Sequence, residues 1–99
     1  MRYIVSGRLR EPCLLSPAEY FTLAVREWEI VLGWLERGTA LAYGRLGTPR
    51  GGAILLDAGS EAEARRLAGT LPFAPYTDVV IWRSDSEAIS RGVAEVILA

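Results

Sequence analysis

Two copies of one helix-start signal divide this chain into two halves. SPAE at residues 16–19 places a serine at a helix N-cap, a proline in the first turn and a glutamate three residues after the serine, and SEAE at residues 60–63 repeats the serine and the glutamate. In such a capping box the two side chains accept hydrogen bonds from backbone N–H groups that a helix end leaves unpaired, so each signal marks where a helix begins. The chain is therefore predicted to hold one helix in each half.

Strand patterns precede and follow both predicted helices. RYIVSGRL (2–9) alternates and is rich in β-formers, and DVVIWR (78–83) has the composition of a strong strand. Between the helices, ALAYGRL (40–46) and AILLDA (53–58) predict a hairpin whose turn is the glycine- and proline-rich GTPRGG (47–52). Glycines are expected to end the helices, the first after Arg37 and the second at about Gly69.

The predicted order of elements is β-α-β-β-α-β, which is the order of the ferredoxin-like split βαβ domain. We therefore predict an α+β fold with a four-stranded antiparallel sheet and both helices on one face. The 99 residues are enough for one domain, so residues 1–99 are expected to form a single unit.

The C-terminal residues 84–99 form an extension beyond the complete fold. They end in VAEVILA, which is too apolar to lie in water. A small chain with such a segment is expected to bury it on a second copy of itself, so the extension is predicted to make an intersubunit contact in a homo-oligomer.

Charge and composition exclude several classes of partner. The formal net charge is −1 and the arginines are scattered, so a nucleic acid is not an expected partner. The N-terminal MRYIVSGRLREP is neither a signal peptide nor a membrane span. The single cysteine, Cys13, permits no internal disulfide, which fits a reducing compartment. We expect a soluble cytoplasmic protein that does not bind membranes.

The chain contains no histidine and no lysine. Schiff-base chemistry on lysine, with pyridoxal phosphate or without it, and histidine-based proton relays are therefore excluded. A catalytic zinc is not expected without imidazole ligands. GTPRGG lacks the spacing and the lysine of a phosphate-binding loop. The sequence thus predicts no cofactor and no metal, and it leaves proton transfer to Asp, Glu, Tyr or Cys.

One set of positions between Val25 and Arg83 follows the pattern of a known family. It consists of Arg26, Glu27, Glu29, Gly38, Arg45, Asp57, Leu71, Pro72, Pro75, Tyr76 and Asp78. Through these positions the sequence resembles the muconolactone Δ-isomerase family. The most specific of them lie in LPFAPYTD (71–78), where the two prolines make the crossover into the last strand rigid. The chain departs from the family in having no histidines in its first and second strands.

The resemblance implies a cofactor-free enzyme with a small-molecule substrate: an isomerase that shifts a proton in an unsaturated lactone or a related conjugated carbonyl compound. Members of the same superfamily include cyclases and cofactor-free monooxygenases, for which aromatic polyketide-type substrates are the alternative. A non-catalytic binding or assembly module is the other alternative, and the absent histidines favour it.

Glu27 is the predicted catalytic base. On a helical wheel an apolar stripe is formed by Phe21, Ala24, Val25, Trp28, Val31, Leu32 and Leu35. Glu27 lies at the edge of this stripe, with Tyr20 nearby. Enclosure by aromatic side chains would raise the pKa of the Glu27 carboxyl into the range useful for moving protons. The alternative is a surface glutamate paired with an arginine.

Arg45 is the predicted substrate-binding cation. In the middle of a strand it either holds a substrate carboxylate with two hydrogen bonds or crosses a dimer contact to an acid such as Asp78.

Tyr76 and Asp78 are the other candidate catalytic residues. They alternate with Thr77 and Val79, so both are expected on one face of the sheet. There Tyr76 could donate a hydrogen bond to a developing enolate or only satisfy its own hydroxyl, and Asp78 is the next carboxylate to consider as the base. Tyr20, Trp28 and Trp82 are candidate substrate-binding aromatics, and core or interface packing is the other interpretation of the tryptophans.

Overall fold

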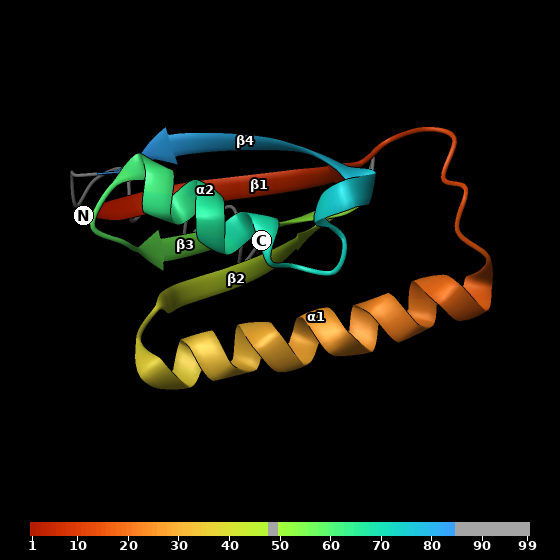
Figure 1. Cartoon of the computed structure of the whole chain (residues 1–99), viewed down its shortest axis with the longest axis horizontal. Helices are drawn as coiled ribbons and strands as arrows, with labels where there is room; N and C mark the ends of the chain where they lie inside the picture. Colours follow the sequence, from red (N-terminus) through yellow and green to blue (C-terminus); the bar gives the residue numbers. More distant parts are fainter. Residues whose placement is uncertain (48–49, 85–99) are drawn as a thin grey trace.

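A computed structural model describes residues 1–47 and 50–84 of the chain (Figure 1). The elements in chain order are β1 (Arg2–Leu9), α1 (Pro17–Arg37), β2 (Ala40–Leu46), β3 (Gly51–Asp57), α2 (Glu61–Gly69), the 3-10 turn η1 (Ala74–Tyr76) and β4 (Thr77–Arg83). The strands form one sheet in the order β2-β3-β1-β4, and each neighbouring pair is antiparallel. This confirms the predicted ferredoxin-like α+β fold.

The helix-start signals act as the sequence predicts. In α1 the backbone N–H of Glu19 donates to Ser16 Oγ at 3.2 Å, and the Ser16 N–H donates back to Glu19 Oε1 at 3.0 Å. In α2 the N–H of Glu63 donates to Ser60 Oγ at 3.1 Å, but the Glu63 carboxylate accepts from the N–H of Gly59 at 2.9 Å. Gly38 ends α1 in the left-handed conformation with φ 79°. Local chemistry therefore sets both helix starts and the end of α1.

The core lies between the helices and one face of the sheet. Tyr3 and Val5 of β1 point to this face, where they join a buried cluster with residues of both helices. That cluster consists of Tyr3, Val5, Val31, Trp34, Ala40, Ile54, Leu56, Ala58, Ala64 and Ala68. The small alanines of α2 allow that helix to lie close to the sheet.

The side of α1 that faces the sheet differs from the predicted apolar stripe. Val31 and Trp34 are the buried residues of the helix, whereas Phe21 is 70% exposed, and Val25, Trp28 and Leu32 are exposed too. Phe21, Val25 and Leu32 belong neither to the core cluster nor to the cavity lining, whereas Trp28, although 46% exposed, lines the cavity. The stripe prediction was therefore wrong for three residues, because α1 carries apolar side chains on more than one side and a helical wheel alone does not identify the side that packs. Because Val31 and Trp34 face the sheet, Glu27, which is one turn before Val31, is also directed toward the sheet.

The two helices cover different parts of the sheet. α1 packs mainly along the edge strand β2, while α2 packs on β1 and β4. Figure 1 shows α1 displaced toward the β2 edge and α2 over the centre of the sheet. The region between α1, α2 and the sheet floor holds the cavity described below.

The observed start of β3 differs from the predicted one. β3 begins at Gly51 rather than at residue 53, so the last two glycines of the predicted turn are strand residues.

Of the C-terminal extension, only Ser84 is described: its N–H donates to the carbonyl of Arg2 at 2.8 Å. Residues 85–99 lie outside the described part of the chain, so their docking on a partner subunit stays a prediction. Neither helix in the described residues is long and apolar enough to span a membrane.

Candidate functional site

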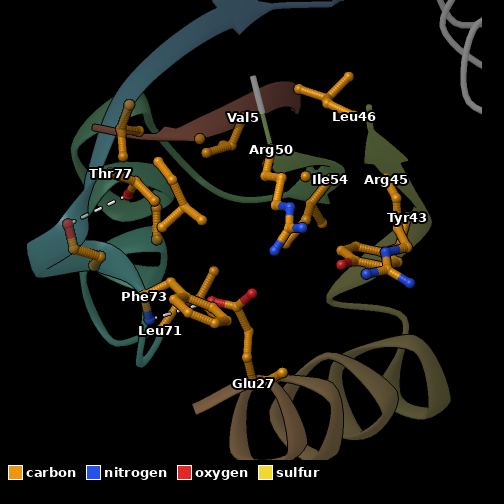
Figure 2. A pocket seen from close by; sticks show the side chains of 18 of the residues that line it. Val5, Glu27, Tyr43, Arg45, Leu46, Arg50, Ile54, Leu71, Phe73 and Thr77 are labelled. Atoms are coloured by element: carbon orange, nitrogen blue, oxygen red, sulfur yellow. Dashed lines mark hydrogen bonds between the residues drawn. The ribbon is translucent and has the colours of Figure 1, made fainter. Parts of the chain in front are cut away.

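A cavity of about 930 Å³ lies between α1, the inner face of the sheet and the segment that connects α2 to β4. Figure 2 shows that side chains from these elements converge on it. The charged and aromatic residues that line it are Tyr20, Glu27, Trp28, Tyr43, Arg45, Arg50 and Phe73. The volume suits a small organic molecule.

Glycines form much of the cavity floor. Gly7 of β1 is paired with Gly52 of β3, and Gly52 is paired in turn with Arg45 of β2. A Cβ added at Gly52 would lie 3.3 Å from Cε2 of Tyr43, which is tighter than ordinary contact. The absence of side chains at this pair therefore leaves room above the sheet where a ligand ring can lie.

Glu27 is the carboxylate of the site. It projects from the inner side of α1 and is partly buried, and its Oε1 accepts a hydrogen bond of 3.4 Å from the backbone N–H of Phe73. Burial raises the pKa of Glu27 above its ordinary value, and the bond from Phe73 offsets this rise in part. Tyr20, whose ring lies 5.1 Å from that of Phe73, completes the aromatic surroundings. Glu27, Tyr20 and Trp28 all line the cavity.

Tyr43 lines the cavity from β2, and sequence reasoning did not select it. Its ring is half-buried and lies 5.5 Å from the ring of Trp28. Burial raises the pKa of Tyr43, the nearby Glu27 carboxylate raises it further, and the positive charge of Arg45 lowers it. The signal for Tyr43 was present in the sequence, because residues two apart in a strand share a face and Arg45 was already a candidate.

Two arginines line the cavity. Arg45 lies on the inner face of β2, opposite Gly52. Arg50 lies just before β3, and its guanidinium carbon is 5.7 Å from the centre of the Tyr20 ring. Neither arginine forms an ion pair with a carboxylate in residues 1–47 and 50–84. Sequence reasoning missed Arg50, since nothing in the turn GTPRGG indicates where its side chain points.

Three of the predicted site residues are not among the residues that line this cavity: Tyr76, Asp78 and Trp82. Thr77 and Val79 face inward, so the alternation of β4 turns Asp78 and Trp82 to the outer face of the sheet, where Trp82 is 51% exposed. Asp78, the second candidate for the base, therefore does not line the cavity that contains Glu27.

Asp78 instead has a partner on the surface of its own chain. Arg10 Nη1 donates to Asp78 Oδ1 at 3.3 Å and to the carbonyl of Thr77 at 3.2 Å, and Arg10 Nη2 donates to the carbonyl of Pro75. Asp78 thus helps hold the rigid crossover, and an exposed pair of this kind contributes ~0–1 kcal/mol. Tyr76, in η1, is 40% exposed.

Side chains for a metal ion do not gather in the described residues. No group of three or more His, Cys, Asp or Glu lies together there, and the cavity is lined by one carboxylate and two guanidinium groups. The arrangement can bind an organic anion through the arginines, exchange a proton with it through Glu27 and donate a hydrogen bond to it from the Tyr43 hydroxyl.

Comparisons with known proteins support the fold. No protein-family model matches the chain, and no curated protein matches it. Among solved structures, that of muconolactone isomerase superposes with a TM-score of 0.71 at 22% identity, over 88% of this chain and 94% of that one. A 5-chloro-2-hydroxyhydroquinone dehydrochlorinase from Burkholderia phenoliruptrix AC1100, solved in complex with 2,5-dihydroxybenzoquinone, superposes with a TM-score of 0.58 at 18% identity, over 90% and 98%. The fold of this chain is that of muconolactone isomerase, which confirms the resemblance at the level of fold.

Proposed function

We propose that this chain, which has the fold of muconolactone isomerase, is a cofactor-free isomerase. Its substrate is an unsaturated lactone, or a related conjugated carbonyl compound, that carries a carboxylate. Glu27 moves one proton between two carbons of this substrate, and Arg45 binds the carboxylate. The nearness in fold to two small-molecule enzymes supports a catalytic role, and the residues of the cavity support the type of reaction.

The observation that carries the proposal is the half-buried Glu27 carboxylate in a cavity with two arginines that form no ion pair within the described residues. A carboxylate whose pKa is raised by burial accepts a proton from carbon more readily than an exposed one and still releases it afterwards. A proton shift between nearby carbons of a conjugated system needs one such base to take the proton from the first carbon and return it to the second. Histidine, lysine and a metal are not required.

The charges in the cavity favour an acidic substrate. Two arginines and one glutamate line the cavity, so its lining carries net positive charge before a ligand binds. A planar guanidinium donates two parallel hydrogen bonds to a carboxylate, and this geometry both binds the substrate and orients it. The glycine floor leaves the substrate ring free to lie against the sheet, within reach of Glu27.

A panel of unsaturated lactone acids tests the proposed function. The protein is incubated with each compound in D₂O, and ¹H NMR follows both the movement of the double bond and the loss of signal at exchangeable carbons. We expect isomerisation of at least one compound, with deuterium entering at the carbons that the proton shift connects to the extent that the Glu27 proton exchanges with solvent before it is returned. Tight binding without isomerisation or exchange for every compound would contradict catalysis and favour the alternative of a binding module.

Arg45→Lys is expected to weaken the binding of acidic ligands about 10-fold or more. Lysine keeps the positive charge but loses the planar pair of donors, and hydrogen bonds to charged groups are worth ~1.5–3 kcal/mol. The melting temperature should hardly change, since Arg45 has no ion pair within the described chain. Calorimetric titration with the same acids, beside a melting curve, measures both quantities. Arg65→Lys is the control, because Arg65 is exposed and forms an ion pair with Glu61 of its own helix. Unchanged affinity with a lowered melting temperature would show a structural role for Arg45.

We also propose that the chain forms a homo-oligomer through the outer face of the sheet. Val80 and Trp82 of β4 lie on this face and are about half exposed, an arrangement that a second copy would cover. Trp82→Glu should lower the mass measured by light scattering to that of a smaller assembly. Leu14→Glu is the matched control, since Leu14 is 88% exposed in the loop before α1. An unchanged mass for Trp82→Glu would place the contact elsewhere.

A further inference from the structure

We infer that Tyr43 is a catalytic residue of this site: its hydroxyl donates a hydrogen bond to the oxygen of the substrate on which negative charge develops while Glu27 holds the proton. This inference rests on the proposed function, and it adds the acid that a single carboxylate base lacks. A proton taken from carbon next to a carbonyl leaves an enolate, whose charge has to be stabilised where it forms.

The first support is the direction of the side chain. Tyr43 lies on the inner face of β2, paired with Ile54 of β3, and both residues line the cavity. Figure 2 shows the Tyr43 hydroxyl pointing from β2 into the part of the cavity toward which the Glu27 carboxylate and the Arg50 guanidinium also point. A substrate that lies between α1 and β2 would have the base on one side and the phenol on the other.

The second support is that the hydroxyl is available as a donor. The structure gives it no hydrogen bond to any residue within 1–47 and 50–84, whereas the hydroxyl of Tyr3 in the core has the sulfur of Met1 as a partner at 3.8 Å. A half-buried tyrosine usually satisfies its hydroxyl. An inward-pointing hydroxyl without a partner in the described protein therefore leaves its hydrogen bond for a ligand.

The third support is electrostatic. The ring is fixed against Trp28, and both burial and the Glu27 charge keep the pKa of Tyr43 above its ordinary value. The hydroxyl therefore stays protonated while Glu27 works as the base, so the two groups take complementary roles at the same pH. Arg45 and Tyr43 lie two residues apart on the same face of β2 and both line the cavity, so a substrate carboxylate bound at Arg45 would lie on the same side of the cavity as the phenol.

The proposed proton shift has two halves. A Glu27 oxygen takes the proton as the C–H bond breaks, the electron pair forms a new C=C bond, and the carbonyl oxygen becomes an enolate that accepts the hydrogen bond from Tyr43. In the second half the C=O bond re-forms and Glu27 returns the proton to the distal carbon of the conjugated system. Tyr43 keeps its proton throughout, and neither an oxidant nor a reductant is needed.

Two measurements on Tyr43→Phe test the inference. The phenylalanine keeps the ring that packs on Trp28 and removes only the hydroxyl. The substrate is the lactone acid that the intact protein isomerises. With it, kcat should fall about 10²–10³-fold with KM little changed, which is the usual loss when one donor to an oxyanion is removed. Tyr3→Phe is the control, because it removes the hydroxyl of a core tyrosine that is not among the residues lining the cavity.

The second measurement does not need turnover. 4-Hydroxy-3-nitrobenzoate, titrated at a pH where its phenol is ionised, presents a carboxylate and an oxyanion on one ring, and 3-nitrobenzoate presents the carboxylate alone. Tyr43→Phe should bind the first compound about 10-fold or more weakly than the intact protein does, since a hydrogen bond to a charged group is lost. Its affinity for the second compound should be unchanged.

The outcomes separate the inference from the proposed function. Equal affinity of the intact protein and Tyr43→Phe for the phenolate, or an equal loss for both compounds, would overturn the role of Tyr43 whether or not the protein turns over a lactone. A selective loss for the phenolate in a protein that isomerises nothing would overturn the proposed isomerisation and keep the oxyanion site.

Discussion

Replacing Glu27 by glutamine is expected to lower the turnover of the isomerisation about 10²–10⁴-fold, the range found when a general base is removed. Glutamine has the shape of glutamate and can still accept the hydrogen bond that Phe73 donates at 3.4 Å, so the cavity should keep its form. Substrate affinity should change little, because the arginines bind the carboxylate. The measurement is the initial rate of isomerisation with the best compound of the lactone panel, together with the rate of deuterium exchange at carbon.

Glu29→Gln is the matched control for this prediction. Glu29 lies two residues further along α1 and is exposed, so the same chemical change there should leave the rate as it is. Equal rates for the intact protein and Glu27→Gln would move the base to another residue. In the described chain Glu27 is the only carboxylate that lines the cavity, so that result would also contradict the proposed site.

Glu27→Gln should also change how the stability of the protein depends on pH. The pKa of Glu27 is raised in the folded protein because burial disfavours the ionised form. The stability that the carboxyl contributes is therefore fully present below its unfolded pKa of about 4.3 and is lost as the pH rises through the higher folded value. Glutamine does not ionise, so Glu27→Gln should melt at a higher temperature than the intact protein at pH 7. The difference should shrink as the pH falls toward 4.

Gly51→Ala is expected to have the largest effect on stability. A Cβ at Gly51 would lie 2.0 Å from the carbonyl oxygen of Gly7 and 3.0 Å from the Cα of Arg8. These are backbone atoms of the paired strand β1, so no side chain can move to relieve the overlap. Overpacking typically costs ~1–3 kcal/mol, and we expect the upper end or more, which lowers the melting temperature of a domain this size by more than about 10 °C.

Gly69→Ala is the control for Gly51→Ala. Gly69 is the last residue of α2, and a Cβ there meets nothing within 4 Å. Alanine in a helix is favoured over glycine by roughly 0.5–1 kcal/mol, so this variant should melt at the same temperature or slightly higher. Circular dichroism during heating measures both variants. A normal melting temperature for Gly51→Ala would show that β1 and β3 do not approach each other this closely at the end of the cavity.

The sequence by itself determined the order and most boundaries of the elements. Ser16 with Glu19, Ser60 with Glu63, and Gly38 set helix ends through hydrogen bonds and backbone conformations that involve only near neighbours. The alternation of residues 2–9 predicted a strand because side chains two residues apart share one face of a strand. The α+β fold followed from this order, because few topologies accommodate β-α-β-β-α-β with short connections.

The start of β3 shows where local signals fail. Gly51 and Gly52 belong by composition to a turn, yet they continue the strand because β1 and β2 pair with them on either side. Pairing partners far along the chain therefore decided both the strand boundary and the glycine floor of the cavity.

Only the tertiary structure decided which residues meet in the candidate site. α1 is apolar on several sides, so its rotation, and with it the inward position of Glu27, depends on how Val31 and Trp34 pack against the sheet. The direction of β4 turned Asp78 away toward Arg10, and the return of the hairpin brought Arg50 over Tyr20. A sequence pattern shows which residues share a face of one element, but the packing between elements determines which faces meet, and at this site that packing placed Tyr43 with Glu27.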